Sequence, residues 1–330
     1  MLQDLKMVLH ARSWMKKNEP FLPTWHAYVG YKLDLFAKLR QGLTLADCVE
    51  RWGYSREILE CWADAGLELG HLRKTEAGTL IPSKEMQTYF TKESPSCIGE
   101  LLREMLEMHI PALLSYPQLL QGQEKHMYYS DTYGQTVAAT SALIEKRAFP
   151  LVYKWMKKKR ARSVLDIGCG NAGYLIRMAE KQRKGRYIGV DINADVVLQA
   201  RQAIEHRPQI EVHHTKMEEW AGPAEPVHMV MMNNILHYYS PNDRADLFHR
   251  TASFLKKNGT LTIITPLYLE RGGRLFSAAF NSFMNAHQNL YSLPRRKELV
   301  RDAKKAGLSC RSVKTVVREG SWYFMAFEKK

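Results

Sequence analysis

The segment Val164–Gly173 places a short apolar run directly before a cluster of glycines. The run Val164–Ile167 is typical of a buried β-strand. Gly168, Gly170 and Gly173 then interrupt it, and apolar residues recur with helical spacing after them. Open α/β sheets hold nucleotide-like ligands with a strand, a glycine turn and a helix in this order, because glycine lets backbone N–H groups approach closely. The segment therefore predicts such a sheet with a ligand site.

Two acidic residues flank this turn and narrow the choice of ligand. A second predicted strand, Tyr187–Val190, ends in Asp191, which lies 21 residues after Gly170. An acid at that position is placed to accept hydrogen bonds from both ribose hydroxyls. Asp166 precedes the first glycine by two residues, where it would repel the pyrophosphate of a dinucleotide. A cationic group, such as the ammonium of S-adenosylmethionine, suits this carboxylate better.

The pattern D-x-G-x-G-x-x-G together with Asp191 resembles the class I S-adenosylmethionine-dependent methyltransferases. The resemblance implies an α/β fold, with a Rossmann-like seven-stranded sheet and S-adenosyl-L-methionine as the cofactor. The chain departs from this class at one point, because Lys216 or Met217 stands where an acid commonly lies near the adenine amino group. The residues predicted for the cofactor site are Asp166, Gly168, Gly170, Asp191, Ile192, Met217 and Asn233.

The rest of the second half supplies the remaining strands. Apolar runs predict strands over residues 210–214, 227–232, 259–265, 310–317 and 321–328. The last two are joined by a short turn with glycine, which indicates a hairpin. A hairpin gives the sheet an antiparallel edge, as in the methyltransferase sheet and not in the all-parallel dinucleotide-binding sheet.

Length and composition predict a cytoplasmic protein of two domains. The chain has 330 residues, of which 45% are hydrophobic and 25% charged, as in ordinary globular proteins. No apolar run is long enough to span a membrane, and the charged N-terminus does not read as a signal peptide. The five cysteines are scattered and form no C-x-x-C pair. This favours reduced thiols and predicts neither disulfides nor a metal site.

The net charge of +14 is confined to one half of the chain. Residues 1–150 hold 17 basic and 18 acidic side chains, whereas residues 151–330 hold 31 basic and 16 acidic ones. This excess keeps nucleic acid open as a methyl acceptor. However, the N-P-P-Y type of motif that attacks a base amino group is absent, because residues 233–236 read Asn-Asn-Ile-Leu. A nucleic-acid partner is therefore not expected.

The first 95 residues predict three helices followed by a two-stranded hairpin, which is the order of a winged helix. On the third helix, Arg56 stands with Glu57, Glu60 and Asp64. Such a net negative face would repel duplex DNA. The predicted elements include helices over residues 25–39 and 56–65, the latter ended by Gly66, and strands within 67–72 and 79–82.

A winged helix before this sheet resembles the small-molecule O-methyltransferases of plants and bacteria. In that family the N-terminal domain forms a homodimer and covers the partner's substrate pocket. The resemblance implies the same here. It divides the chain into a winged-helix dimerisation domain (1–95), a helical connector (96–150) and an S-adenosylmethionine-binding methyltransferase domain (151–330).

Five residues are candidates for catalysis and for contact with the acceptor. In the O-methyltransferases, a histidine followed by an acid and a tryptophan is the general base. His237 matches the histidine, but two tyrosines replace its neighbours, so the alternative is a histidine that packs near the cofactor. The predicted substrate residues are Tyr133, from a polar loop over 127–134, and Phe283, Met284 and His287, from an irregular or briefly helical insertion over 267–293.

These features predict an S-adenosylmethionine-dependent methyltransferase. The expected acceptor is a hydroxyl of a planar or aromatic small molecule. The sequence leaves three alternatives open: a small-molecule N- or C-methyltransferase, a nucleic-acid methyltransferase, and a non-catalytic S-adenosylmethionine-binding regulator. It does not identify the acceptor.

Overall fold

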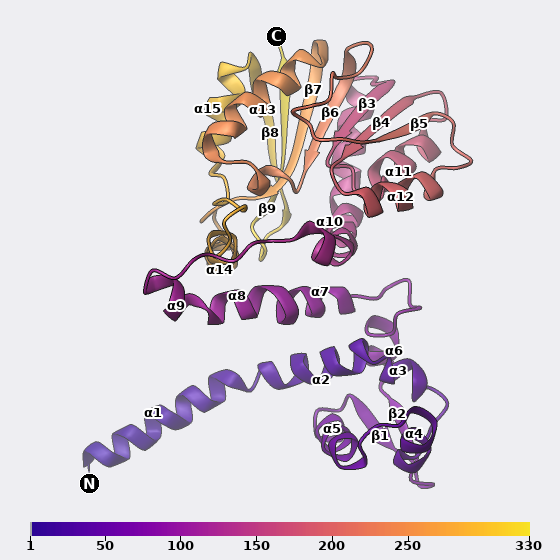
Figure 1. The fold of residues 1–330 in the computed structure, drawn as a ribbon, viewed down its shortest axis with the longest axis vertical. Helices are drawn as coiled ribbons and strands as arrows, with labels where there is room; N and C mark the ends of the chain where they lie inside the picture. Colours follow the sequence, from indigo (N-terminus) through magenta and orange to yellow (C-terminus); the bar gives the residue numbers. More distant parts are fainter. Residues whose placement is uncertain (1) are drawn as a thin grey trace. The chain divides into compact units, whose positions relative to one another are not determined.

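The computed structural model describes residues 2–330, except for the side chains of residues 2, 130 and 131. The chain divides into two compact units, residues 1–108 (unit 1) and 109–330 (unit 2). Figure 1 traces the elements of each unit in sequence order. Within the described residues, no helix has the length and apolar character needed to cross a membrane.

Unit 1 is mainly helical and carries one small hairpin. β1 (Leu72–Lys74) pairs antiparallel with β2 (Leu80–Pro82), and Leu43 adds an antiparallel bridge to the second strand. The predicted hairpin is present, but five helices of the described residues precede it where the sequence predicts three. The helices are α1 (Leu2–Asn18), α2 (Phe21–Lys32), α3 (Leu35–Lys38), α4 (Leu45–Trp52), α5 (Arg56–Glu68), α6 (Lys84–Tyr89) and α7 (Gly99–Glu104), followed by the π-helical turn η1 (Met105–His109).

The second helix differs from its predicted bounds at both ends. α2 begins at Phe21 and not near Trp25, because Pro23 lies in its first turn, where a missing N–H costs no hydrogen bond. It ends at Lys32, since Asp34 adopts a left-handed conformation with φ of 55°. The predicted single helix over residues 25–39 is therefore two helices.

Gly66 does not end α5, as the sequence suggested. The helix continues to Glu68 and buries Gly66 within it. A Cβ at this position would lie 2.4 Å from Nε2 of His26. The glycine therefore permits a close approach of side chain to helix and does not mark a turn. The first strand of the hairpin consequently begins at Leu72 and not at Leu67.

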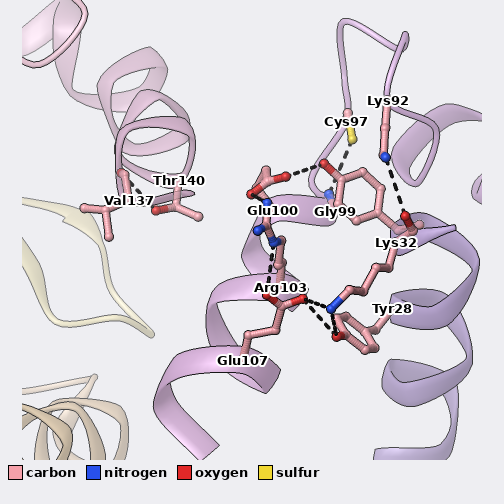
Figure 2. A network of polar contacts seen from close by, with 11 residues as sticks. Tyr28, Lys32, Lys92, Cys97, Gly99, Glu100, Arg103, Glu107, Val137 and Thr140 are labelled. Carbon is pink, nitrogen blue, oxygen red and sulfur yellow. Dashed lines mark hydrogen bonds and ion pairs between the residues drawn. The ribbon is translucent and has the colours of Figure 1, made fainter. Parts of the chain in front are cut away.

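A polar network joins α2 to the helix that closes unit 1 (Figure 2). The carboxylate of Glu107 accepts hydrogen bonds from the Tyr28 hydroxyl at 2.9 Å, the Lys32 ammonium at 2.8 Å and the Arg103 guanidinium at 3.1 Å. Burial acts to raise the pKa of Glu107, but these donors outweigh it and hold the pKa below its ordinary value. The carboxylate therefore stays ionised between the two helices.

Unit 2 is built around a seven-stranded sheet with the order β5-β4-β3-β6-β7-β9-β8. Neighbouring strands from β5 to β7 are parallel, whereas β9 is antiparallel to both of its neighbours. This confirms the predicted α/β sheet with its C-terminal hairpin. The strands are β3 (Ser163–Ile167), β4 (Arg186–Asp191), β5 (Ile210–His214), β6 (Val227–Asn233), β7 (Leu255–Pro266), β8 (Leu308–Val317) and β9 (Trp322–Lys329).

Helices cover both faces of this sheet (Figure 1). One face packs against α10 (Ser130–Lys158), α11 (Gly173–Lys181) and α12 (Ala194–Ala203), and the other against α13 (Pro241–Ser253) and α15 (Arg296–Lys305). Because both faces are buried, the central strands are nearly continuous apolar runs. Polar residues that serve a ligand are thus left to the strand ends, where helices do not cover the sheet.

Two segments of unit 2 are more regular than predicted. α10 begins at Ser130, so Tyr133 lies on a helix and not in a polar loop. The insertion over 267–293 contains the twelve-residue helix α14 (Arg274–Asn285), which buries Phe280, Phe283 and Met284 on one side. Polar residues near the start of each helix hid the periodicity, and neither helix has a side-chain cap. The remaining elements are α8 (Ile110–Leu114), α9 (Tyr116–Leu120) and η2 (Leu236–Tyr238).

Candidate functional site

The glycine turn connects β3 to α11 at the carboxyl end of the sheet. Gly168 and Gly170 adopt φ values of 71° and 53°, which glycine reaches without strain. A Cβ on Gly168 would lie 2.4 Å from the Ile235 side chain, so this glycine also permits a close contact. The N–H groups of Gly168 and Cys169 donate to the carbonyl of Val190 at 2.8 and 3.1 Å. The turn is thereby fixed to the end of β4.

Asp191 is the last residue of β4 and holds the same turn. Its Oδ2 accepts a hydrogen bond from the N–H of Gly170 at 2.8 Å, and its Oδ1 accepts one from the N–H of Asn193 at 3.0 Å. Each carboxylate oxygen has two lone pairs, so both oxygens can still accept a hydrogen bond from a ligand hydroxyl. The sequence pattern predicts the ligand contact but not the support of the turn.

Three side chains beside the turn carry buried polar atoms that no described residue satisfies. These atoms are Oδ1 of Asp166, both amide atoms of Asn233, and Oδ1 of Asn234. Buried polar groups in proteins are normally hydrogen-bonded. Their grouping at the ends of β3 and β6 therefore indicates a place where a polar ligand supplies the missing partners.

The charge at this place favours a cation. Asp166 is 1% exposed, and burial raises the pKa of its carboxyl well above the ordinary value, with Glu145 and Asp191 adding to the shift. A positive group nearby would lower that pKa again and restore the carboxylate. The site thus suits the ammonium that the sequence predicts here.

A cavity of about 500 Å³ opens at this edge of the sheet. Its volume is in the range of small-molecule binding sites. Among its described lining residues, four are acidic and one, Lys216, is a lysine. The wall includes all seven residues predicted for the cofactor: Asp166, Gly168, Gly170, Asp191, Ile192, Met217 and Asn233.

Other parts of the wall come from segments remote from the glycine motif. Glu145 reaches the cavity from α10, and Trp322 from the start of β9. Asn289 accepts a hydrogen bond from the N–H of Tyr128 at 2.9 Å and donates one to its carbonyl at 2.7 Å, which holds Tyr128 in the wall. No motif marks Glu145 or Trp322, so the sequence predicts neither of them as part of the site.

His237 follows β6 in the short helix η2 and does not line the cavity. Its ring is 3% exposed and lies 4.4 Å, centroid to centroid, from that of Tyr238. Burial lowers its pKa to about 3, and the charge of Arg244 adds to this shift, so the imidazole is neutral near pH 7. Nδ1 has no hydrogen-bond partner among the described residues. The base role of His237 stays a prediction.

None of the four predicted substrate residues is among the described lining residues of the cavity. Tyr133 stacks on Tyr128 with ring centroids 5.9 Å apart, and the ring of His287 meets Tyr128 edge-on at 6.0 Å. Phe283 and Met284 are buried on α14. Tyr128 therefore links two members of this group to the cavity wall, and the role of all four stays a prediction.

Comparison with known proteins finds a methyltransferase domain in the central part of unit 2. Residues 164–259 match the family model described as a methyltransferase domain. A trans-aconitate 2-methyltransferase of Azoarcus sp. (strain BH72) is 32% identical over 106 residues, which cover 32% of this chain and 40% of that enzyme. The chain thus spans less than half the length of the curated relative it matches. It contains a methyltransferase domain around the predicted glycine motif.

Solved structures share the fold over nearly the whole chain. An O-methyltransferase family protein from Burkholderia thailandensis superposes with a TM-score of 0.74 at 16% identity, covering 97% of this chain and 98% of the other. Human N-acetylserotonin methyltransferase, solved with S-adenosylmethionine, gives a TM-score of 0.72 at 16% identity with the same coverages. This similarity confirms the predicted fold class.

Proposed function

We propose that this protein transfers the methyl group of S-adenosylmethionine to a hydroxyl of a planar or aromatic small molecule. The observation that carries the proposal is the group of unsatisfied buried polar atoms on Asp166, Asn233 and Asn234, within the cavity wall at the glycine turn. The match of this segment to a methyltransferase domain supports the same function.

The residues of the wall fit the parts of this cofactor. Asp191 would accept hydrogen bonds from the ribose hydroxyls, as acids at this strand end do. The turn at Gly168 and Gly170 would hold the methionine part, with the carboxylate of Asp166 near its ammonium. Ile192 and Met217 offer apolar contacts to the adenine, and Asn233 offers the amide groups that its surroundings leave unsatisfied.

Methyl transfer requires mainly that the acceptor be held in the correct position. S-adenosylmethionine supplies a methyl group on a positively charged sulfur, so the chain's task is to hold the acceptor atom in line with it. A hydroxyl with a pKa near ~10 gains from a base near neutral pH. We propose His237 as this base, because its imidazole is neutral and its Nδ1 has no hydrogen-bond partner among the described residues. A pKa of about 3 is too low for an efficient base, so this role requires the bound acceptor to raise the pKa of His237 towards neutrality. If the acceptor is instead an amine or a carbon, this base is not needed.

The aromatic rings of the cavity wall bear on the choice of acceptor. The rings of Tyr128, Tyr238 and Trp322 line the cavity and offer an apolar surface to an uncharged planar molecule. We therefore place the acceptor among uncharged aromatic compounds, with Tyr133, Phe283, Met284 and His287 supporting its pocket.

We further propose that unit 1 is a winged-helix dimerisation domain and that the protein acts as a cytoplasmic homodimer. The helix α1 exposes several large apolar side chains, and exposed apolar surface marks an interaction site when it is extensive. All five cysteines are free thiols, as expected in a reducing compartment. The apolar side chains that α1 exposes are Leu5, Met7, Val8, Leu9, Trp14 and Met15, each more than half accessible.

One experiment tests the function and its rivals together. The protein is incubated with S-adenosylmethionine labelled in its methyl group and with a cell extract, and the products are separated before and after nuclease treatment. Label in a small aromatic molecule supports the proposal. Label that becomes soluble only after nuclease treatment indicates a nucleic-acid methyltransferase. Cofactor binding without any transfer, together with retention of specific DNA, indicates a regulator.

A further inference from the structure

Glu145 is an unusual feature of the cavity, because it lies outside the matched methyltransferase domain, on α10. The side chain of Glu145 is 9% exposed, and Glu145 is one of the residues that line the cavity. A carboxylate is costly to bury unless a partner or ligand stabilises its charge. Its position therefore calls for an explanation beyond helix packing.

The third glycine of the motif provides the first argument. A Cβ on Gly173 would lie 2.3 Å from Oε2 of Glu145, and the two next nearest atoms, at 2.9 Å, belong to the same carboxyl group. The backbone of Gly173 is not in the left-handed region, so its conformation does not require glycine. Gly173 leaves the space that the carboxylate of Glu145 occupies.

The surroundings of Glu145 provide the second argument. Arg177 of α11 donates a hydrogen bond to Oε1 at 2.6 Å, and the carboxylate lies against the first residue of that helix, where the helix dipole favours negative charge. Burial raises the pKa of Glu145, while Arg177 and Lys146 oppose the shift. These contacts support an ionised group at one end of the cavity.

The neighbouring acids provide the third argument. Asp166 and Asp191 line the same cavity, and the charge of Glu145 acts on Asp166. Arg177 neutralises one carboxylate of this group of three. A cation in the cavity would stabilise the other charges, whereas an anion would be repelled.

We infer that Glu145 binds the cofactor: together with Asp166, its carboxylate receives the α-ammonium of the methionine part of S-adenosylmethionine, and Gly173 is glycine to admit it. The inference rests on the proposed function and assigns a cofactor contact to a helix outside the methyltransferase domain. The alternative is that Glu145 only pairs with Arg177 to fasten α10 to α11.

Two nucleosides separate these explanations in a calorimetric titration of the full chain. S-adenosylhomocysteine carries the α-ammonium, whereas 5′-methylthioadenosine has the same adenosine and thioether but no amino-acid part. Glu145→Gln keeps the size of the side chain and removes its charge. It should weaken S-adenosylhomocysteine roughly tenfold to a hundredfold, as expected for a lost charge-assisted hydrogen bond. Binding of 5′-methylthioadenosine should stay within about twofold.

The matched control is Glu180→Gln. Glu180 lies on the same helix as Gly173 and Arg177 but is 57% exposed and pairs with Arg207 outside the cavity. The Glu180→Gln variant should bind S-adenosylhomocysteine and 5′-methylthioadenosine with unchanged affinity. An equal loss for the two nucleosides in Glu145→Gln, or no loss for either, would overturn the inference and leave Glu145 a structural partner of Arg177.

Gly173→Ala gives an independent test that changes no charge. The added methyl should displace the carboxylate and weaken S-adenosylhomocysteine selectively. In a Glu145→Ala background the same methyl meets no carboxylate, so it should cost little more, and the two effects should not add. Additive effects would contradict the inference. A wild-type chain that binds neither nucleoside would instead contradict the proposed function itself.

Discussion

The backbone N–H of Gly170 donates a hydrogen bond of 2.8 Å to Oδ2 of Asp191, so the end of β4 determines the conformation of the turn that follows β3. The same carboxylate is the predicted ribose ligand. One side chain therefore serves both the shape of the glycine turn and its ligand. A substitution at Asp191 must affect both, which distinguishes it from residues that only touch the ligand.

Asp191→Ala should lower the affinity for S-adenosylhomocysteine by about 1.5–3 kcal/mol, the range for hydrogen bonds to a charged group. It should also lower the melting temperature of the ligand-free protein, because the N–H groups of Gly170 and Asn193 lose their acceptor. Calorimetry and thermal unfolding measure the two effects. Asp195→Ala, an exposed position on α12, is the control. A folded Asp191→Ala variant with wild-type affinity would remove Asp191 from the site.

His237→Asn tests the proposed base. For a hydroxyl acceptor the turnover should fall roughly 10²–10⁴-fold, the usual effect of losing a general base, while cofactor affinity changes little. Because burial holds the pKa of His237 at about 3 in the ligand-free chain, its protonation should not reduce the wild-type kcat/KM between pH 8 and 5. His249→Asn, at an exposed position on α13, should behave as wild type. A His237→Asn variant that stays within about threefold of the wild-type rate would argue for an amine or carbon acceptor.

The exposed apolar side chains of α1 predict the oligomeric state. Leu9 and Trp14 are 54% and 64% exposed, and we expect a second copy of the chain to cover them. Leu9→Glu combined with Trp14→Glu should convert the dimer to a monomer, because two charges would be buried without partners. Light scattering at micromolar concentration measures the change. Glu57→Gln on α5 serves as the control. A wild-type chain that is already monomeric would refute the dimer.

Unit 1 contains a buried histidine pair that predicts a loss of stability in acid. Nε2 of His26 lies 3.0 Å from the carbonyl of Trp62, and its Nδ1 lies 2.9 Å from Nδ1 of His71. The carbonyl only accepts, so Nε2 donates, and in the neutral ring Nδ1 then accepts a hydrogen bond from Nδ1 of His71. Burial, with the charge of His71 adding, lowers the pKa of His26 to about 4, so His26 is neutral near pH 7.

Because the folded-state pKa of His26 is depressed, the stabilisation is complete above the unfolded pKa of about 6.5 and is lost as the pH falls through the folded value. The free energy of unfolding of unit 1 should fall by on the order of 3 kcal/mol across this interval. Chemical denaturation between pH 7.5 and 4 measures it. His26→Phe keeps a ring against Trp62 but does not titrate, so its slope should be shallower. Equal slopes would contradict the role of the pair.

Glu107 predicts a further loss of stability in acid in the same unit, over a lower pH range than that of His26. Its pKa is depressed by the donors that surround it, so its contribution is present above the unfolded pKa of about 4.3 and is lost below the folded value. Glu107→Gln should destabilise unit 1 at pH 7 by about 1–3 kcal/mol. The difference from wild type should shrink near pH 3. A difference that is constant with pH would show that the charge of Glu107 contributes nothing.

The centre of the site could be predicted from the sequence because its information is local. Strand, glycine turn and helix stand within residues 163–181, and Asp191 follows at the end of the next strand. A parallel sheet brings such strand ends to one edge. For the same reason all seven predicted cofactor residues line one cavity.

The other site residues and the helix ends depend on tertiary contacts, which no local sequence pattern contains. Glu145 reaches the cavity only because α10 packs beside α11, and Gly66 was misread because its neighbour, His26, lies far away in sequence. His237 occupies the predicted place after β6, but the direction of its ring is set by packing around Tyr238 and Phe280. Fold class follows from periodicity, whereas side-chain direction follows from tertiary contacts.

The position of β9 bears on how the protein is made. It follows β8 in the sequence, yet it lies between β7 and β8 in the sheet and carries the fully buried run Phe324–Phe327. A nascent chain that still lacks this run has two strand edges without partners and an apolar gap between them. Such edges pair readily with other chains. Unit 2 therefore closes its sheet only after Trp322–Lys329 has been synthesised and has paired with both neighbouring strands, and a delay at that step should favour aggregation.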